Sequence, residues 1–237
     1  ARIFDELVLR KRVDGVLTVG VKISEAELAK LTELEKPIIG VGGPIPGTRT
    51  IAIDDEGAGR LATSHLISLG HTKVGMISGS PVTEMDFHQP HLRRTGYQEA
   101  LLDANLSFDP QWEAQGDFTV GGGYFAAKQL FGNPQNAPTA IFCASDEMGF
   151  GAIQAARDLG LRVPQDVSVI GIDGHPLGEF YGLSTVDQSV QQQGAKAANT
   201  LVDILESNDP KAQENFESIT FWPIDLVVRS STARRTL

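Results

Sequence analysis

Cysteine is nearly absent from the sequence, and so are hydrophobic runs long enough to cross a membrane. Cys143 is the single cysteine among 237 residues, which excludes a disulfide bond within the chain. It lies inside the apolar run from Thr139 to Ser145, where we expect a buried thiol that serves packing and not chemistry. The longest apolar runs have the length of β-strands, so we expect no membrane partner and find no secretory signal in these residues.

Positive charge is also scarce. The chain carries 20 lysines and arginines against 30 aspartates and glutamates, a formal net charge of -10. Such a balance repels a polyanion and leaves no basic stripe able to neutralise many phosphates. The short basic clusters Arg10–Arg12 and Arg234–Arg235 are expected to be solvated surface. The chain is therefore not expected to bind DNA by itself.

Hydrophobic residues make up 41% of the sequence, which is enough to bury a sizeable core. Runs typical of strands alternate with helical patterns almost throughout, which predicts an α/β fold with parallel sheets and right-handed crossovers. The predicted strands cover residues 13–19, 37–41, 50–53, 73–78, 112–118, 167–173, 183–187 and 221–229, with one more at Ala140. The predicted helices cover residues 56–69, 94–106, 122–131, 147–159 and 190–205.

Polar residues follow four of the predicted strands at their carboxyl ends. These ends meet at one edge of a parallel sheet, which is where such sheets bind ligands. The residues are the loop from Gly79 to Arg93, Asp117–Phe118, Ser145–Asp146 and Asp173. Carboxylates accept paired hydrogen bonds from hydroxyl groups, and an aromatic face packs on a sugar or a base. The edge suits a polyhydroxylated ligand better than a metal ion, because the acids lie on separate strands and Arg93 adds positive charge.

Asp173 has two possible roles on this pattern. It ends the apolar run that begins at Val167 and is followed by Gly174, and an Asp-Gly pair is a common turn former. Its position at the carboxyl end of a buried strand favours a ligand contact instead. No partner for acid–base chemistry is placed near it, so we expect Asp173 to recognise a ligand and not to react with it.

Motifs of enzymes are incomplete in this chain. The run Gly40–Gly43 follows a strand as a dinucleotide-binding motif would, but Pro44 and Pro46 prevent the helix that must hold the pyrophosphate. No Walker lysine occurs, Ser78–Ser80 does not complete a nucleophile elbow, and Gly121–Gly123 is expected to be a flexible helix entry. We therefore expect no catalytic residue, no cofactor and no enzymatic activity. An α/β enzyme remains an alternative that turnover of a bound ligand would support.

Four of the five histidines come in two pairs. His88 and His91 have the spacing of zinc ligands on a helix, but Pro90 lies between them, so we expect a loop near the ligand and no metal site. His65 lies on a helix flank, and His71 comes just after the same helix. For both we expect a solvated position or a role against the helix dipole.

Eight segments resemble, in their order and spacing, the effector-binding core of bacterial transcriptional regulators of the LacI/GalR family. They are Val13–Leu17, Ser68–His71, Arg93–Leu101, Gly116–Phe118, Cys143–Asp146, Val163–Asp173, Thr185–Gln188 and Asp225–Thr232. The similarity extends over nearly the whole chain. No single segment decides it, but the ordered set is highly specific.

The resemblance implies a periplasmic-binding-protein-like type I fold. In this fold, two α/β subdomains with parallel sheets are joined by three crossovers, and the ligand binds in the cleft between them. Residues 1–54 and 189–218 are expected to form the N-terminal subdomain, which lacks its first strands here, and residues 55–188 and 219–237 the C-terminal subdomain. The family's DNA-binding headpiece would precede the matched region and is absent from these residues.

The resemblance also assigns ligand-binding roles to five positions. The family's ligand arginine falls on Arg93, its stacking aromatic on Phe118 and its strand-end carboxylate on Asp173. The polar residue at a helix entry falls on Ser145, and a crossover residue near the cleft falls on Gln188.

Three further positions bear on the ligand. Asp146 is expected to cap the helix that follows it and not to contact the ligand. The loop at residues 82–92 is longer than usual in the family, and Gly42–Gly43 stand where some sugar regulators have an acid. These two departures leave the identity of the ligand open.

The function that the resemblance implies is effector sensing without chemistry. A sugar or sugar derivative would bind in the cleft and shift a homodimer between states that present its headpieces differently to operator DNA. Such a regulator would act in the cytoplasm. The alternative is an extracytoplasmic sugar-binding protein of a transport system, which a signal peptide encoded upstream of Ala1 would indicate.

Overall fold

A computed structural model describes residues 13–20, 24–33, 36–79, 89–209 and 218–235. The chain divides into two compact units. Of the described residues, unit 1 contains 13–53 and 190–222, and unit 2 contains 54–79, 89–189 and 223–235. Within this part of the chain, no helix is both long and apolar enough to span a bilayer.

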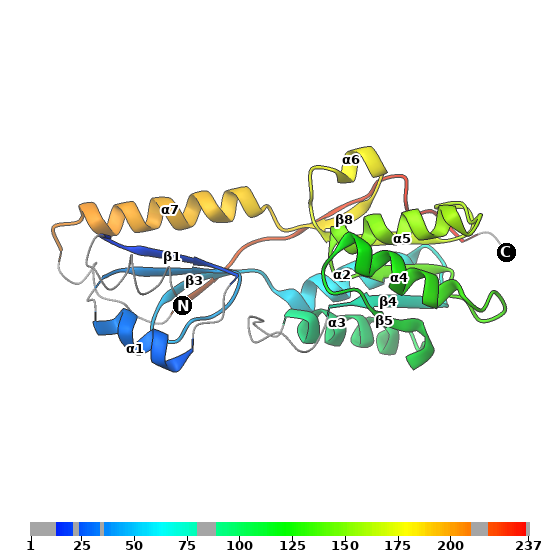
Figure 1. Ribbon diagram of the computed structural model, residues 1–237, viewed down its shortest axis with the longest axis horizontal. Coiled ribbons are helices and arrows are strands. Elements are labelled where there is room, and N and C mark those ends of the chain that lie inside the picture. Colours follow the sequence, from blue (N-terminus) through cyan, green and yellow to red (C-terminus); the bar gives the residue numbers. More distant parts are fainter. Residues whose placement is uncertain (1–12, 21–23, 34–35, 80–88, 210–217, 236–237) are drawn as a thin grey trace. The chain divides into compact units, whose positions relative to one another are not determined.

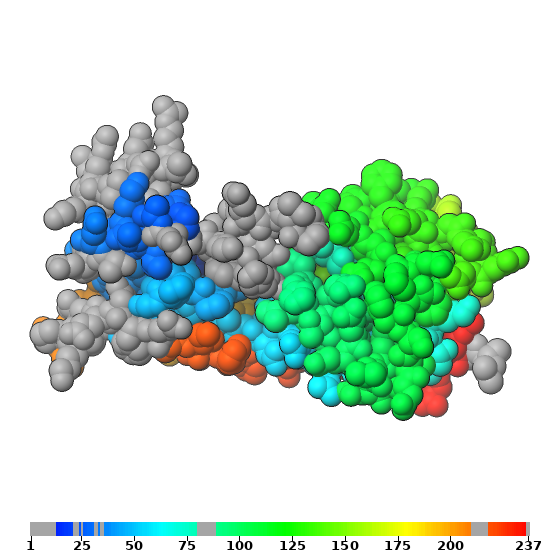
Figure 2. Space-filling view, turned by 90° about the horizontal axis from the view of Figure 1, so that it is seen from below, coloured from blue at the N-terminus to red at the C-terminus, as the bar shows by residue number. Residues whose placement is uncertain are grey.

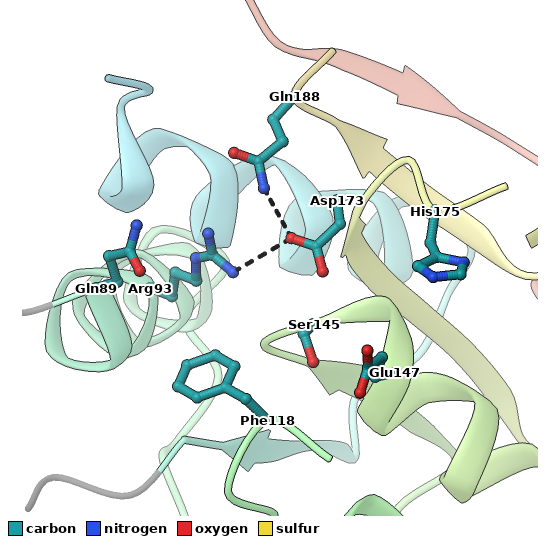
Figure 3. Close-up of a pocket in the computed structure, with 8 residues that line it drawn as sticks. All are labelled: Gln89, Arg93, Phe118, Ser145, Glu147, Asp173, His175 and Gln188. Carbon is teal, nitrogen blue, oxygen red and sulfur yellow. Dashed lines mark hydrogen bonds and ion pairs between the residues drawn. The ribbon is translucent and has the colours of Figure 1, made fainter. Parts of the chain in front are cut away.

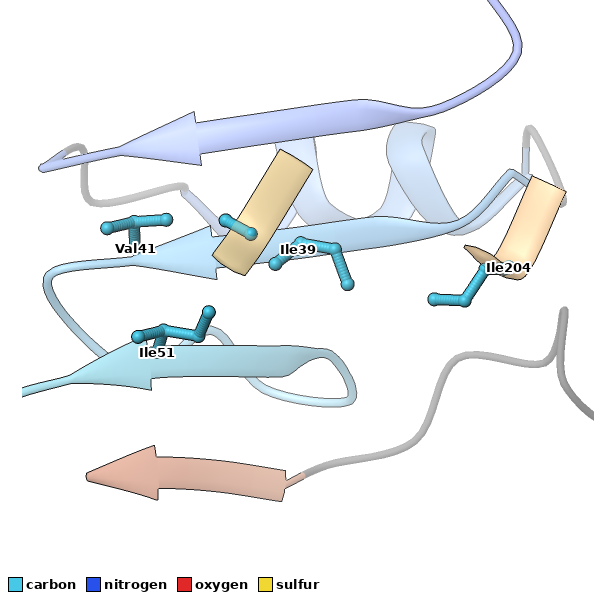
Figure 4. Packing of buried hydrophobic residues seen from close by; sticks show 5 residues of the cluster. Ile39, Val41, Ile51 and Ile204 are labelled. Atoms are coloured by element: carbon cyan, nitrogen blue, oxygen red, sulfur yellow. The ribbon is translucent and has the colours of Figure 1, made fainter. Parts of the chain in front are cut away.

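Unit 1 is built on a four-stranded parallel sheet with the order β1-β2-β3-β9. Its strands are β1 (Val16–Val19), β2 (Ile38–Val41), β3 (Arg49–Ala52) and β9 (Ser218–Phe221), and its helices are α1 (Glu25–Glu33) and α7 (Val190–Glu206). The two helices lie on opposite sides of this sheet (Figure 1). The buried cluster where α7 meets the sheet consists of Ile39, Val41, Ile51, Ala197 and Ile204 (Figure 4).

Unit 2 is built on a six-stranded sheet with the order β10-β8-β7-β6-β4-β5, parallel except for the edge strand β10. Its strands are β4 (Val74–Ser78), β5 (Glu113–Gln115), β6 (Ala140–Cys143), β7 (Ser168–Asp173), β8 (Ser184–Asp187) and β10 (Asp225–Val227). Its α-helices are α2 (Asp55–Ser68), α3 (Gln89–Asp103), α4 (Val120–Phe131), α5 (Asp146–Asp158) and α6 (Gly178–Tyr181). The predicted α/β architecture with parallel sheets is confirmed.

The helices of unit 2 form two layers. α2 and α3 pack together on one face of the sheet, and α4 and α5 pack together on the other (Figure 1). The side chains of α3 and of the residues that follow it form a continuous surface (Figure 2). Every residue of the central strands β4 and β6 is buried, as strands covered on both faces require. Cys143 of β6 is buried as predicted, and this burial raises the pKa of its thiol.

Two close contacts between helices depend on glycine. A Cβ atom at Gly96 of α3 would lie 2.0 Å from the carbonyl oxygen of Glu56 on α2. A Cβ atom at Gly151 of α5 would lie 2.1 Å from the carbonyl oxygen of Val120 on α4. A larger residue at either position would push the paired helices apart. Because Arg93 is carried by α3, the tight α2–α3 contact also fixes where this arginine lies.

The prediction of one final strand at residues 221–229 is wrong. Phe221 ends β9 in the sheet of unit 1, whereas Asp225 begins β10 in the sheet of unit 2. Pro223 lies between them and has no N–H group to donate to a strand ladder. The apolar run therefore supplies two short strands to two different sheets.

The predicted loop leading to Arg93 is wrong from Gln89 onward, because α3 begins at that residue. Pro90 occupies the first turn of the helix, where its missing N–H is not needed for an intrahelical bond. His91 is an exposed residue of the same turn. His88, the other member of the predicted pair, lies outside the described residues.

The expectation of a solvated or dipole-related role is wrong for His71. Its side chain is only 3% exposed, with Nδ1 3.0 Å from the hydroxyl of Thr139 and Nε2 3.1 Å from the hydroxyl of Ser168. His65 is half-buried, and its Nε2 lies 3.1 Å from the hydroxyl of Thr232. Burial lowers the pKa of both histidines, because a charged imidazole is poorly solvated there. Both rings are therefore part of the hydrogen bonding that holds unit 2 together.

Candidate functional site

A pocket of about 220 Å³ opens at the carboxyl edge of the unit 2 sheet (Figure 3). Its lining residues come from the segments that follow β5, β6, β7 and β8 and from the first turns of α3. They are Gln89, Arg93, Phe118, Ser145, Glu147, Asp173, His175 and Gln188. The five residues predicted from the sequence therefore lie together in one pocket, although their part in ligand binding stays a prediction.

Asp173 is held in an unusual conformation at the end of β7. Its φ is 141°, which is strained for any residue with a side chain, and such strain is commonly found at functional sites. Gln188 Nε2 donates a 2.7 Å hydrogen bond to Oδ1, and the backbone N–H of Asp146 donates a longer one of 3.4 Å to Oδ2. Burial raises the pKa of Asp173, and the charge of Arg93 opposes this shift. The carboxylate is thus fixed by neighbouring groups and still faces the pocket.

Arg93 is almost wholly enclosed, with 3% of its surface exposed. Its Nε donates a 2.8 Å hydrogen bond to Oδ1 of Asp55, and its Nη1 donates one of 2.5 Å to the carbonyl oxygen of Ala144. The distance from Nη1 to Oδ1 of Asp173 is 3.9 Å. These contacts hold the guanidinium facing Asp173, and the two hydrogen bonds occupy two of its five N–H donors.

Phe118 reaches the pocket from a strained loop after β5. Asp117 and Phe118 have φ values of 51° and 56°, and both residues are in the left-handed region that glycine prefers. The ring lies against Gly79, where an added Cβ atom would come within 2.0 Å of it. Because Gly79 has no side chain, the phenyl ring of Phe118 fits against it and lines the pocket. In this position the face of the ring can pack on a ligand.

The prediction that Asp146 caps α5 is wrong. The cap is Ser145, whose hydroxyl accepts a 3.3 Å hydrogen bond from the backbone N–H of Met148. Asp146 is instead the first residue of the helix. Its carboxylate is fully buried and accepts a 2.8 Å hydrogen bond from the backbone N–H of His175. Ser145 therefore caps α5 in addition to lining the pocket.

Burial also changes the acidity of Asp146. It raises the pKa of the carboxyl to about 7, and the negative charge of Asp173 acts in the same direction. The hydrogen bond from His175 opposes this shift, because it stabilises the ionised form. Two carboxyl groups thus lie one behind the other at the pocket.

Three lining residues were not singled out as ligand contacts from the sequence: Gln89, Glu147 and His175. Gln89 lay within the predicted loop from Gly79 to Arg93. Gln89 lies one helical turn before Arg93, so a correct start for α3 would have placed it at the pocket. Glu147 follows Ser145 in the first turn of α5, and His175 comes two residues after Asp173. Both were visible as polar residues beside predicted ones.

Comparison with known proteins supports the same fold. The profile of a family described as "Periplasmic binding protein-like domain" matches residues 63–232. The HTH-type transcriptional repressor PurR of Haemophilus influenzae (strain PittEE) is 34% identical over 230 residues, which cover 95% of this chain and 66% of that protein. PurR of Aliivibrio fischeri (strain ATCC 700601 / ES114) is 34% identical over 97% of this chain and 67% of its own length. The chain therefore spans about two thirds of the length of these curated relatives.

Solved structures give the same result. A transcriptional regulator CelR–cellobiose complex is 30% identical with a TM-score of 0.82, and the match covers 97% of this chain and 69% of that one. A LacI family transcriptional regulator from Mycobacterium smegmatis is 30% identical with a TM-score of 0.79, and the match covers 99% and 84% of the two chains. The chain belongs to the periplasmic binding protein-like domain family and is the effector-binding core of a LacI-type regulator.

Proposed function

We propose that this chain is the sensing part of a regulator that binds operator DNA. A sugar or sugar derivative would bind in the pocket of unit 2. The observation that carries the proposal is the convergence of Asp173, Arg93 and Phe118 on one small pocket (Figure 3). A carboxylate accepts hydrogen bonds from adjacent hydroxyl groups, and the face of a phenyl ring packs on the C–H face of a sugar ring. The cellobiose bound by CelR, a structural relative, supports the choice of a sugar.

The proposed mechanism is a shift between two states of a homodimer. Ligand that binds one state more tightly than the other changes their populations, and this changes how the dimer presents its DNA-binding segments. The curated relatives are helix-turn-helix repressors, which supports a DNA-binding segment and action in the cytoplasm. Support for a dimer comes from α6, where the phenyl ring of Phe180 is 84% exposed beside the partly exposed Tyr181.

We propose recognition without turnover at this pocket. Asp173 is engaged by Gln188 and faces Arg93, and Ser145 caps a helix. A hydroxyl nucleophile needs a base within hydrogen-bonding reach, and the bonds of Ser145 lead to backbone only. These arrangements favour binding over catalysis.

The test is a thermal-shift screen of the chain against sugars, sugar derivatives and nucleosides, because a ligand that binds the native state raises its melting temperature. A sugar is expected to stabilise the wild type and not the Asp173→Ala variant. Asp158→Ala, which removes an exposed carboxylate of α5, is the matched control and should respond like the wild type. Equal stabilisation of wild type and Asp173→Ala by every active compound would remove the site from consideration.

The regulatory part of the proposal needs the complete gene product. We expect the DNA upstream of Ala1 to encode a helix-turn-helix, and we expect the effector to change operator affinity at least tenfold in fluorescence anisotropy. A signal peptide in that place would support a transport receptor instead.

A further inference from the structure

The charges that line the pocket are unbalanced. Asp173 and Glu147 are carboxylates, and Arg93 is the cation that faces them. The close-up view shows all three side chains around the same space (Figure 3). Whether the pocket attracts or repels an anion therefore depends on how much of the charge of Arg93 is available to a ligand.

The positive charge of Arg93 is already compensated by the carboxylate of Asp55. The side chains of Arg93 and Asp55 are 4% and 6% exposed, and the distance from Nε to Oδ1 is 2.8 Å. A buried ion pair at this distance is strongly coupled, because little water screens it. Nη1 is in addition bound to the carbonyl oxygen of Ala144. Arg93 can thus offer an N–H donor to the pocket, but its positive charge is matched by Asp55.

One ring nitrogen of His175 is engaged by the backbone. Its Nδ1 accepts a 3.1 Å hydrogen bond from the backbone N–H of Leu177. Behind it, Asp146 places a further carboxyl group next to Asp173.

The amino end of α5 does not supply an anion site either. Helix amino ends attract anions through free N–H groups and the helix dipole. Here the N–H of Met148 is occupied by the hydroxyl of Ser145, and the first turn already contains Asp146 and Glu147. The positive end of the α5 dipole is therefore already compensated by the carboxyl groups of Asp146 and Glu147.

We infer that the pocket selects an effector without negative charge, and that it rejects phosphorylated or carboxylated forms of the same compound. This inference rests on the proposed effector-sensing function and narrows its ligand class to neutral or amino sugars. Asp173 and Glu147 would accept hydrogen bonds from hydroxyl or ammonium groups. A phosphate would meet two carboxylates and an arginine whose charge Asp55 has matched. Asp55 is thus a positioning residue that also sets the charge selectivity.

The first test is calorimetry with matched compounds: glucose, glucosamine, glucuronate and glucose 6-phosphate, together with ribose and ribose 5-phosphate. In each series that binds, the anionic members are expected to bind at least about tenfold more weakly than the neutral or amino member, because like charges repel at close range. An anionic member that binds as tightly as its neutral parent would overturn the inference.

A second measurement does not depend on the identity of the effector. Inorganic phosphate is titrated at constant ionic strength into the wild type and into Glu147→Lys, which replaces a carboxylate of the pocket lining with a cation. The wild type is expected to show no saturable change in melting temperature, and Glu147→Lys is expected to gain one. Saturable binding by the wild type, or no gain in the lysine variant, overturns charge selection. If charge selection holds while no sugar binds, the sugar class of the proposed function fails instead.

Discussion

The side-chain amide of Gln188 donates a 2.7 Å hydrogen bond to Oδ1 of Asp173. Gln188 follows β8 and Asp173 ends β7, so the bond joins two neighbouring strands at the pocket and helps to hold a carboxylate whose φ is 141°. Gln188→Ala is expected to weaken effector affinity about tenfold, because the carboxylate loses the bond that orients it. Calorimetry with a ligand from the screen measures this loss. Gln154→Ala is the matched control on the exposed face of α5, and equal affinities of both variants would contradict the orienting role.

The ion pair between Asp55 and Arg93 predicts a large loss of stability. Asp55→Asn keeps the shape of the side chain but leaves the buried guanidinium without its counter-charge, which is expected to cost about 3 kcal/mol of unfolding free energy. Urea denaturation measures it. Glu99→Gln removes one partner of an exposed pair with Arg60, whose atoms lie 3.7 Å apart, and should cost less than about 1 kcal/mol. Similar losses in the two variants would mean that the buried pair contributes no more than a surface pair.

Asp146 predicts a pH dependence of stability with a definite sign. Burial raises the pKa of its carboxyl from 3.8 to about 7, so between these values the folded chain binds a proton that the unfolded chain releases. The unfolding free energy should therefore fall as the pH rises from about 4 to 7. Asp146→Asn removes this contribution and flattens the profile. Asp158→Asn, at the exposed end of α5, serves as the control and should leave the slope over this range in place.

The sequence predicts the parts of this fold that follow from local pattern. The continuous apolar runs of β4, β6 and β7 indicated central strands. Every residue of these three strands is buried except Asp173, the last residue of β7. Gly121–Gly123 was expected at a helix entry and lies in the first turn of α4. The meeting of Arg93 and Asp173 at one edge followed from the rule for parallel sheets.

Other features depend on contacts that no local pattern contains. Ser145 and Asp146 are both good capping residues, so the choice between them is made by geometry, in which Asp146 turns inward to the N–H of His175. The partner of Arg93 is Asp55, which lies 38 positions earlier in the chain. Pro90 was interpreted as a helix breaker because its place in the first turn of α3 was not foreseen.

Ser145 allows capping and ligand binding to be separated. Ser145→Ala removes the acceptor for the N–H of Met148 and should cost about 1 kcal/mol of stability. Thr119→Ala removes the equivalent bond to Gly122 at the start of α4, away from the pocket lining, and should cost a similar amount. If Ser145 also contacts the effector, affinity measured by calorimetry falls only in Ser145→Ala. Equal affinities would assign Ser145 to capping alone.

His71 predicts a loss of stability in acid that opposes the effect of Asp146. Burial lowers the pKa of His71 below its ordinary value of 6.5, so as the pH falls through this value the unfolded chain takes up a proton before the folded chain does. The contribution of His71 to stability is therefore lost on acidification, whereas that of Asp146 is gained. His71→Gln should reduce the acid-induced part of the loss, and His91→Gln, at an exposed histidine of α3, should not. The two effects overlap between about pH 4 and 6.5. Urea denaturation across that range therefore measures each effect as a difference in unfolding free energy: wild type minus His71→Gln for His71, and wild type minus Asp146→Asn for Asp146. A difference profile for His71→Gln that does not change with pH would show that this ring is not the source of the acid sensitivity.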